Sequence, residues 1–298
     1  MRKGRELAES YAFILPSFAL KVIFGVYPII WALRYMFYDY RGYGTATFTG
    51  LDNFSRLIKD ELLWKSVWNT FVYAGGKVAL TIPIALILAV ILNGKLKGRQ
   101  FLRGIYFLPT IMSAAVMSVV FYIIFNSYNG MLNQLLMNIG IISDPVEWLG
   151  TRYAMLTAII IAAWGAIGNN MLLFLAGLQG IPNDVQESAM IDGANSIQRF
   201  WYITVPMLGP MLQIIIMLAI IAALKGYESI MVLTGGGPAG TTEVMYLYLY
   251  KLLFPVSTGE AVPQDIGYGS AVGFFTAVIV GLITGLYFYL TRKLNRVF

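Results

Sequence analysis

The 298-residue chain has no cysteine and no histidine. The first absence excludes disulfides and thiol chemistry, and the second excludes histidine metal sites and histidine proton relays. Charged residues are also few, at 12%, compared with about 25% in an ordinary soluble domain. Hydrophobic residues instead make up 58% of the chain. We therefore expect an integral membrane protein, with neither a metal site nor a nucleic-acid partner.

Long apolar stretches predict a single all-α transmembrane domain over residues 1–298. A helix needs about 20 apolar residues to cross a bilayer, and backbone groups in lipid must be hydrogen-bonded within their own segment. The first stretch follows a basic N-terminus, as in a signal peptide, but it is too long and lacks a cleavage site, so we expect it to be retained. The six predicted spans are approximately 12–37, 69–93, 102–127, 152–178, 207–232 and 269–291.

The distribution of basic residues indicates which side of the membrane each loop faces. Cytoplasmic loops carry an excess of lysine and arginine. That excess falls at both ends of the chain and in the segment 93–103, which contains no acidic residue. We therefore expect a multi-pass membrane protein with both termini in the cytoplasm.

The predicted cytoplasmic loop 179–206 departs from this pattern. It contains one basic residue, Arg199, and three acidic residues, Asp184, Glu187 and Asp192. Lipid head groups would not select an acidic loop on this side of the membrane, whereas a basic protein surface would. We expect a protein partner here. The alternative is a solvated connector with a surface helix.

Local signals within this loop predict two short helices. Asp184 and Glu187 have the spacing of a capping box, which would start the first helix. Gly193 suits the position that closes a helix, and Ser196 could cap a second one that continues to about Ile203. The small residues expected to face outward on this helix pair are Ser188, Ala189 and Ala194.

The same loop carries a known sequence pattern, E-[AS]-A-x-x-D-G-A-x5-F-x2-I-x2-P. It resembles the EAA loop of binding-protein-dependent ABC importer permeases, with Ser188 in place of the second alanine of the name-giving motif. The segments 107–110 (FLPT), 148–150 (WLG), 177–182 (GLQGIP) and 233–242 (LTGGGPAGTT) extend the resemblance to the MalF-like carbohydrate-uptake branch. The matching residues are Glu187, Ala189, Asp192, Gly193, Ala194, Phe200, Ile203 and Pro206.

The resemblance implies an ABC importer type I permease fold, a location in the bacterial plasma (inner) membrane and a non-catalytic role. Loop 183–206, between the fourth and fifth spans, would provide coupling helices that dock on a separate cytoplasmic ATPase dimer. A second homologous permease subunit, expected as a heterodimer partner, and an extracellular solute-binding protein would complete the importer. The ATPase-coupling residues implied in this way are Glu187, Ser188, Ala189, Asp192, Gly193, Ala194, Phe200 and Pro206.

Nucleotide binding by the chain itself is not predicted. No GxxxxGK[ST] loop is present, so ATP and magnesium are expected on the partner ATPase and no cofactor on this chain. The glycine-rich segment Gly235–Gly237 lacks the Lys-Ser/Thr of a phosphate loop. We interpret it as a flexible turn after a helix, and the resemblance implies a position at the outer mouth.

Polar residues within the predicted spans indicate a substrate path. Sugars favour amides, hydroxyls and aromatic faces, and two adjacent asparagines cannot both face lipid cheaply. The candidate path residues are therefore Asn169, Asn170, Tyr227 and Glu228.

The intramembrane lysines leave alternatives open. Lys225 and Glu228 have i, i+3 spacing and could form a structural pair on one helix face. The alternative is that both line the pore. Lys77 or Lys225 could also supply the cationic lining that a permease for a solute such as glycerol phosphate would want.

Small-xxx-small patterns occur at Gly269/Gly273 and Gly281/Gly285. They would support close helix packing, either within the chain or against the second permease.

Two other function classes receive less support. A stand-alone secondary transporter usually shows internal repeats and an embedded ion site, and we see no repeat here. A membrane enzyme would need a convergent catalytic cluster. The preferred prediction is the permease subunit of an ATP-driven sugar or oligosaccharide importer, which works by alternating access.

Overall fold

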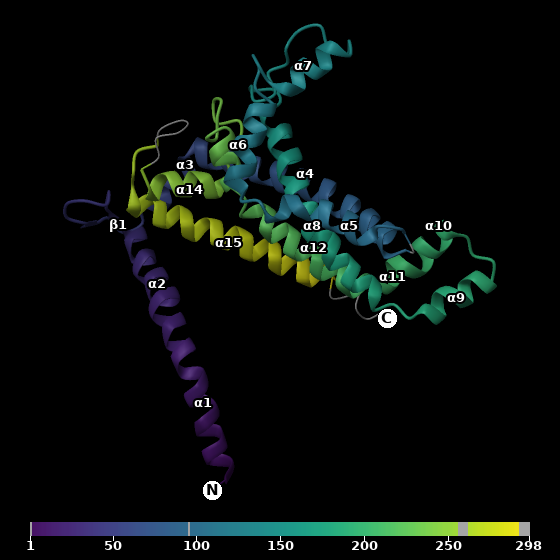
Figure 1. Cartoon of the computed structure of the whole chain (residues 1–298). Helices are drawn as coiled ribbons and strands as arrows, with labels where there is room; N and C mark the ends of the chain where they lie inside the picture. The colour runs from purple at the N-terminus through teal and green to yellow at the C-terminus, as the bar shows by residue number, and fades with distance from the viewer. Residues whose placement is uncertain (1, 95, 256–261, 292–298) are drawn as a thin grey trace. The chain divides into compact units, whose positions relative to one another are not determined.

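Helices form nearly all the regular structure in the computed structural model, which describes residues 2–94, 96–255 and 262–291 (Figure 1). By its contacts the chain divides into two units. Of the described residues, the smaller comprises 2–60, 249–255 and 262–277, and the larger contains 61–94, 96–248 and 278–291. Among the described residues, five helical segments are long and apolar enough to cross a membrane, and a bent helix pair could provide a sixth.

The smaller unit begins with the first predicted span. The helices α1 (Arg2–Lys21) and α2 (Tyr27–Arg34) are joined through the π-helical segment η1 (Val22–Val26), and Tyr11–Phe37 has the length and hydropathy of a span. After the 3-10 turn η2 (Tyr35–Phe37), two short antiparallel strands follow. They are β1 (Tyr38–Asp39) and β2 (Thr47–Phe48).

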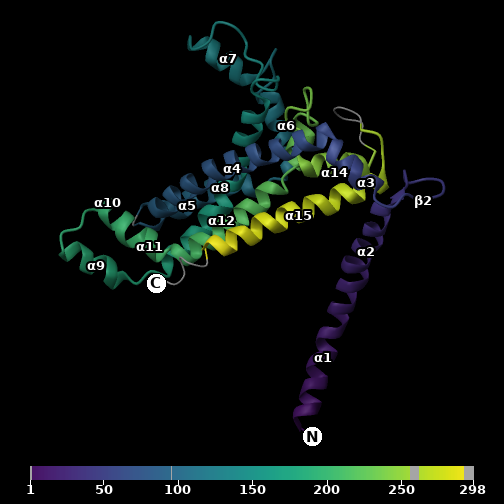
Figure 2. The same cartoon turned by 180° about the vertical axis from the view of Figure 1, so that it is seen from behind.

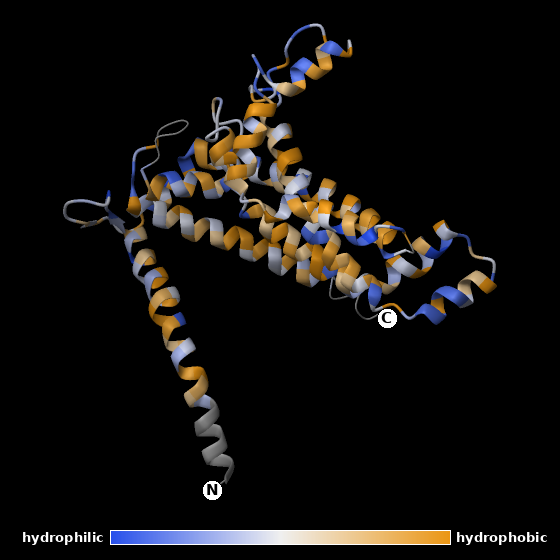
Figure 3. Cartoon of the chain, in the orientation of Figure 1, coloured by the Kyte–Doolittle hydropathy of each residue, from blue (hydrophilic) through white to orange (hydrophobic). Residues whose placement is uncertain are grey.

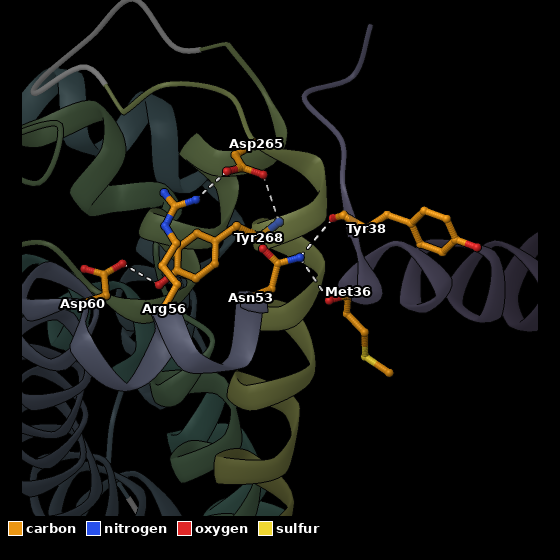
Figure 4. Close-up of polar contacts among 7 residues, drawn as sticks. All are labelled: Met36, Tyr38, Asn53, Arg56, Asp60, Asp265 and Tyr268. Carbon is orange, nitrogen blue, oxygen red and sulfur yellow. Dashed lines mark hydrogen bonds and ion pairs between the residues drawn. The ribbon is translucent and has the colours of Figure 1, made fainter. Parts of the chain in front are cut away.

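A short helix, α3 (Asp52–Lys59), anchors the smaller unit (Figure 4). The Arg56 guanidinium lies 2.6 Å from the Asp265 carboxylate and 3.9 Å from the centre of the Tyr268 ring. The Tyr268 hydroxyl donates to Asp60 over 2.5 Å. The Asn53 amide donates to two backbone carbonyls of the segment that follows α2. Interactions between residues far apart in sequence therefore hold this unit together.

The larger unit is built on α4 (Glu61–Asn93) and α8 (Ala154–Gln179), whose mutual contact is the most extensive in the fold. Helices α5 (Arg99–Ile111) and α12 (Gly209–Leu224) pack on this pair. Figure 3 shows that all four are largely hydrophobic. The second span therefore starts at Glu61 rather than near residue 69. The buried apolar core of this packing includes Ile82, Ala85, Leu92, Met171, Phe174, Leu208 and Ile215.

The third span is not the single helix predicted over 102–127. Helix α5 ends at Ile111, and α6 (Ala114–Ile124) leaves at an angle of 95° to it. Met112 is extended, and the Ser113 hydroxyl accepts a hydrogen bond from the Val116 N–H over 3.3 Å. The prediction was wrong because an N-cap serine lies within an apolar run, where hydropathy gives no sign of a helix boundary.

The fifth span is also interrupted. Helix α12 ends at Leu224, and a new helix, α13 (Glu228–Leu233), begins three residues after Lys225. Lys225 and Glu228 therefore do not share one helix face, and no ion pair joins them among the described residues. The predicted structural pair is wrong. A side chain at Gly226 would come within 3.1 Å of the Tyr73 ring, so close packing accompanies the break.

The connections at one end of the larger unit are ordered by buried amides. Asn133, in α7 (Met131–Asn138), makes four hydrogen bonds, and the Trp148 indole N–H donates one of them. Asn69 of α4 donates to the carbonyls of Gly240 and Glu243. Both side chains are buried. Neither asparagine could be singled out as a structural residue from the sequence.

The glycine-rich turn is part of this ordered region. Gly235–Gly237 are buried, and the hydroxyls of Thr234 and Thr242 lie 2.7 Å apart across the turn. Thr242 also donates to the Gly237 carbonyl. The expectation of a loose turn was therefore wrong, because side-chain hydroxyls satisfy the backbone groups of the turn. Helix α14 (Met245–Leu253) follows it.

The last span is α15 (Ile266–Thr291), as predicted. Side chains at Gly269 and Gly273 would contact leucines of α14. This glycine pair is therefore used for packing within the chain. Side chains at Gly281 and Gly285 would meet nothing within 4 Å. The basic residues predicted to follow this span, Arg292, Lys293 and Arg296, lie outside the described residues, as does Lys95.

Candidate functional site

The segment with the EAA pattern forms a helix pair at one end of the larger unit. Helix α9 (Asn183–Ile191) is followed by α10 (Ser196–Arg199), and both extend beyond the packed ends of α8 and α12 (Figures 1 and 2). The end of the larger unit that carries α7 lies opposite (Figure 1). The two helices predicted from the sequence are therefore present where they were expected.

Gly193 makes the joint between these helices. Its φ of +85° is in the left-handed region, which costs a side-chain-bearing residue energy. The Gly193 N–H donates to the Met190 carbonyl over 3.1 Å, and the Ala194 N–H donates to the Ala189 carbonyl over 2.9 Å. These two bonds define a Schellman motif. The prediction that Gly193 closes the first helix is therefore confirmed, because glycine adopts the left-handed conformation of this helix end without a steric cost.

The predicted N-caps are wrong. Pro182 precedes α9, no side chain caps it, and Asp184 lies within its first turn. The capping box belongs instead to α10, where Asn195 and Gln198 exchange side-chain-to-backbone bonds of 2.9 Å each. Asp184 remains favourable near the start of α9 through the helix dipole. Several residues here have capping chemistry, and only the backbone course decides which of them caps.

The small residues of the pair do not all face outward. Ala189 is buried, Ala194 is half-buried and Ser188 is exposed. Glu187 lies in α9 and Asp192 is the C-cap of that helix, and both acidic side chains are exposed. The expectation was therefore wrong for Ala189, which packs inward, and right for Ser188.

Large apolar side chains are exposed on this helix pair and on the turn that follows it. Ile191 is 86% exposed, Ile197 72% and Tyr202 80%. Trp201 is 60% exposed and packs edge-on against the half-buried Phe200, with their ring centres 5.1 Å apart. We call Ile191, Ile197, Trp201 and Tyr202 the apolar coupling surface. Exposed apolar groups gathered on one short segment are typical of a protein interface.

The second helix of the pair runs almost directly into α12. Helix α10 continues through the π-helical η3 (Phe200–Thr204) and α11 (Val205–Met207) with right-handed backbone angles at every junction. The π-turn lies just before Pro206, whose missing N–H would otherwise interrupt an α-helix. The predicted end near Ile203 is therefore too early. The helix pair is therefore connected to α12 by one helical path that runs from Ser196 to Leu224.

A cavity lies where this helical path ends. Its volume is about 330 Å³, and it combines aromatic, hydroxyl and charged groups from α4, α5 and the α12–α13 break with small residues of α8. The polar residues that line it are Tyr73, Lys77, Thr110, Lys225, Tyr227, Glu228 and Ser229. Tyr73 and Ser229 are in hydrogen-bond contact across it, with their oxygens 3.3 Å apart.

A second cavity of about 330 Å³ adjoins the first. Lys77, Ala166 and Ala222 line both. Its polar residues besides Lys77 are Thr81, Asn169 and Asn170, and its other walls are apolar. The two cavities therefore share a wall at Lys77.

The structure brings the predicted path residues to these two adjoining cavities. Asn169 and Asn170 line one, and Tyr227 and Glu228 line the other. Their role in transport stays a prediction. Lys77 was noted only as an alternative, and Thr81 was not identified. The sequence signal for this wall was a lysine in the middle of a long apolar run, and Thr81 follows that lysine by one helical turn.

Comparison with known proteins agrees with this architecture. A lactose transport permease protein, LacF, of Rhizobium radiobacter is 34% identical over 96% of this chain and 94% of its own length. The trehalose/maltose transport permease protein MalF of Thermococcus litoralis is also 34% identical, over 97% and 96%.

Solved structures show the same fold. A bacterial ABC transporter that imports the acidic polysaccharide alginate aligns with a TM-score of 0.81 at 24% identity, covering 98% of this chain and 99% of its own. The same kind of transporter in complex with an alginate-pentasaccharide-bound periplasmic protein gives a TM-score of 0.83 at 23% identity, over 98% and 96%.

The fold and cavities thus define a multi-pass membrane permease of the ABC importer type. The family model of the binding-protein-dependent transport system inner membrane component matches residues 81–296. The chain belongs to that family.

Proposed function

We propose that this chain is the permease subunit of an ATP-driven, binding-protein-dependent importer of sugars or oligosaccharides. Two relatives named above are permeases for lactose and for trehalose/maltose, over nearly their whole length. The observation that carries the proposal is the helical path from α10 to the cavity at the α12–α13 break. It connects an exposed apolar surface with a polar cavity between membrane helices.

The partners follow from what this surface and this fold require. A separate ATPase dimer binds the apolar coupling surface, and acidic Glu187 and Asp192 meet basic groups on it. A second homologous permease subunit closes the path, and an extracellular solute-binding protein delivers the sugar. In this orientation α9 and α10 lie in the cytoplasm, together with both chain termini.

Alternating access then follows from the helical connection. Closure of the ATPase dimer on ATP binding moves α9 and α10 together, because the Schellman motif joins them. The motion passes through η3 and α11 to α12 and shifts the break at Lys225–Tyr227. The cavities open outward, and ATP hydrolysis resets them inward.

The apolar coupling surface gives a direct test of the ATPase partner. Ile191→Asp places a charge where an apolar contact is required, so co-purification of the ATPase with the permease is expected to fall at least about tenfold. Membrane insertion should not change, because Ile191 is 86% exposed. Ile139→Asp is the matched control, since Ile139 is 58% exposed near α7. Equal loss in both variants would contradict a specific interface at Ile191.

The substrate path is tested by removing its polar groups. Asn170→Leu and Tyr227→Leu should each lower sugar import at least about tenfold, because a sugar hydroxyl loses its partner in a site built for hydrogen bonds. Both variants should still bind the ATPase. Import into proteoliposomes is measured, with Asn138→Leu as a control on exposed α7. Unchanged import in both variants, with the sugar bound elsewhere, would remove these residues from the path.

A further inference from the structure

Lys77 lies where a charged side chain has a high free-energy cost, in the middle of a membrane-spanning helix. It is the central residue of α4, sixteen positions from Glu61 and sixteen from Asn93. At 1.5 Å per residue its backbone lies about 24 Å from either helix end, too far for the side chain to reach the head groups. A charged group at this depth faces a cavity and has a functional role in most membrane proteins.

No protein carboxylate balances Lys77 in the described part of the chain. No acidic side chain lies within 4.0 Å of its ammonium group, and its recorded contact is with the face of the Tyr73 ring, at 5.9 Å. The first cavity is lined by two lysines, Lys77 and Lys225, and by one acid, Glu228. The second cavity has Lys77 as its charged residue. The lining therefore carries one positive charge in excess.

Hydrogen-bond donors surround the same position. Thr81, one helical turn after Lys77, is 2% exposed, and its hydroxyl has no hydrogen-bond partner. The Asn170 side-chain amide donates one N–H to the Ala166 carbonyl over 2.8 Å, and the same NH₂ group has a second N–H. Asn169 lines the same cavity. An ammonium, a hydroxyl and amide groups around one cavity are suited to a ligand that accepts hydrogen bonds and carries negative charge.

We propose that the imported sugar carries a carboxylate, as a uronic acid unit does, and that Lys77 is its counter-charge during passage. The inference rests on the proposed function and names its substrate class. A neutral sugar would leave Lys77 without a partner, whereas a carboxylate matches the single excess charge. A phosphate ester carries about −1.5 to −2 at pH 7 and would overcompensate it. The cavity volumes, about 330 Å³ each, fall within the range of known ligand sites, roughly 300–1,000 Å³.

The test uses the complete importer in proteoliposomes with its own solute-binding protein. Four probes are compared: galacturonate, which carries one carboxylate, its neutral methyl ester, lactose and glycerol 3-phosphate. Lys77→Met should lower galacturonate import at least about tenfold, the value of one charge-assisted hydrogen bond, and leave import of the ester unchanged. Lys77→Arg should retain import of the acid. Lys21→Met is the matched control, because it removes a lysine from a span without lining either cavity.

A second measurement needs no variant. Galacturonate, and not its methyl ester, should raise the thermal unfolding midpoint of the wild-type permease–ATPase complex. Import of lactose with ATP hydrolysis, but no import of galacturonate, would overturn the proposal and leave the importer function standing. Equal loss of acid and ester import in Lys77→Met would overturn it as well. Lys77-dependent import of glycerol 3-phosphate, without import of galacturonate, would replace the carboxylate with a phosphate. If none of the four probes is imported on ATP, both proposals are contradicted.

Discussion

Gly193→Leu is expected to separate ATP hydrolysis from transport while the protein still inserts in the membrane. Gly193 has a φ of +85°, and a Cβ added there would meet nothing within 4 Å. The damage is therefore to the backbone, where a left-handed conformation costs a leucine roughly 1–2 kcal/mol. That strain opposes the Schellman motif that fixes α9 to α10. Import should fall about tenfold, the change that 1.4 kcal/mol corresponds to, and more if the joint opens.

Two further variants identify the cause. Gly193→Asn should retain most import, because asparagine tolerates the left-handed region better than other residues. Gly140→Leu provides the matched control, because Gly140 has a φ of +73° and an open surrounding but follows α7. Import and ATPase activity are measured on the reconstituted complex. Normal coupled import by Gly193→Leu would rule out a rigid joint at this glycine.

Gly168→Ala is expected to destabilise the larger unit, although it adds one methyl group. The new carbon would lie 2.4 Å from the Tyr106 carbonyl oxygen and 2.8 Å from the Phe107 Cα. Both are backbone atoms of α5, so the whole helix must move away from α8. Overpacking of this kind costs roughly 1–3 kcal/mol. Because α5 also lines the first cavity, import should decrease along with stability.

A neighbouring glycine gives the control for this effect. Gly165→Ala would place its methyl 2.7 Å from the Met117 Cε, the flexible end of a side chain. Methionine can move to another rotamer, so the variant should unfold close to wild type. The thermal unfolding midpoints of the purified proteins are compared. Equal stability of both variants would show that α5 does not depend on Gly168 for its contact with α8.

Hydropathy alone predicted where apolar helices lie, because crossing a bilayer requires a run of apolar residues of nearly fixed length. All six predicted spans correspond to helical segments of the structure. Hydropathy could not predict the break after Ile111, since the flanking residues are equally apolar. The break after Leu224 coincides with the short polar stretch Lys225–Glu228, which an average over a window of span length conceals. Those breaks depend on Ser113, which caps a helix, and on Gly226, which packs against Tyr73.

The candidate site likewise combines features that the sequence predicts with features that only the fold creates. The EAA pattern and Gly193 could be recognised in the sequence, because a left-handed helix end selects glycine locally. The exposed apolar coupling surface could not, because the packing of the whole unit decides which apolar side chains, such as Ile191 and Tyr202, stay exposed after folding. Asn133 and Asn69 were missed for a related reason. Their partners, such as Val146 and Gly240, are remote in sequence.

The chain's sequence by itself determined the class of protein, the approximate spans and the turn at Gly193. Each depends on composition or on a few adjacent residues. Only the tertiary structure decided that Lys77 lies on the wall between two cavities, with Thr81, Asn169 and Asn170 beside it. A cavity is formed by α4, α8 and α12 together, and no segment of the sequence contains that arrangement.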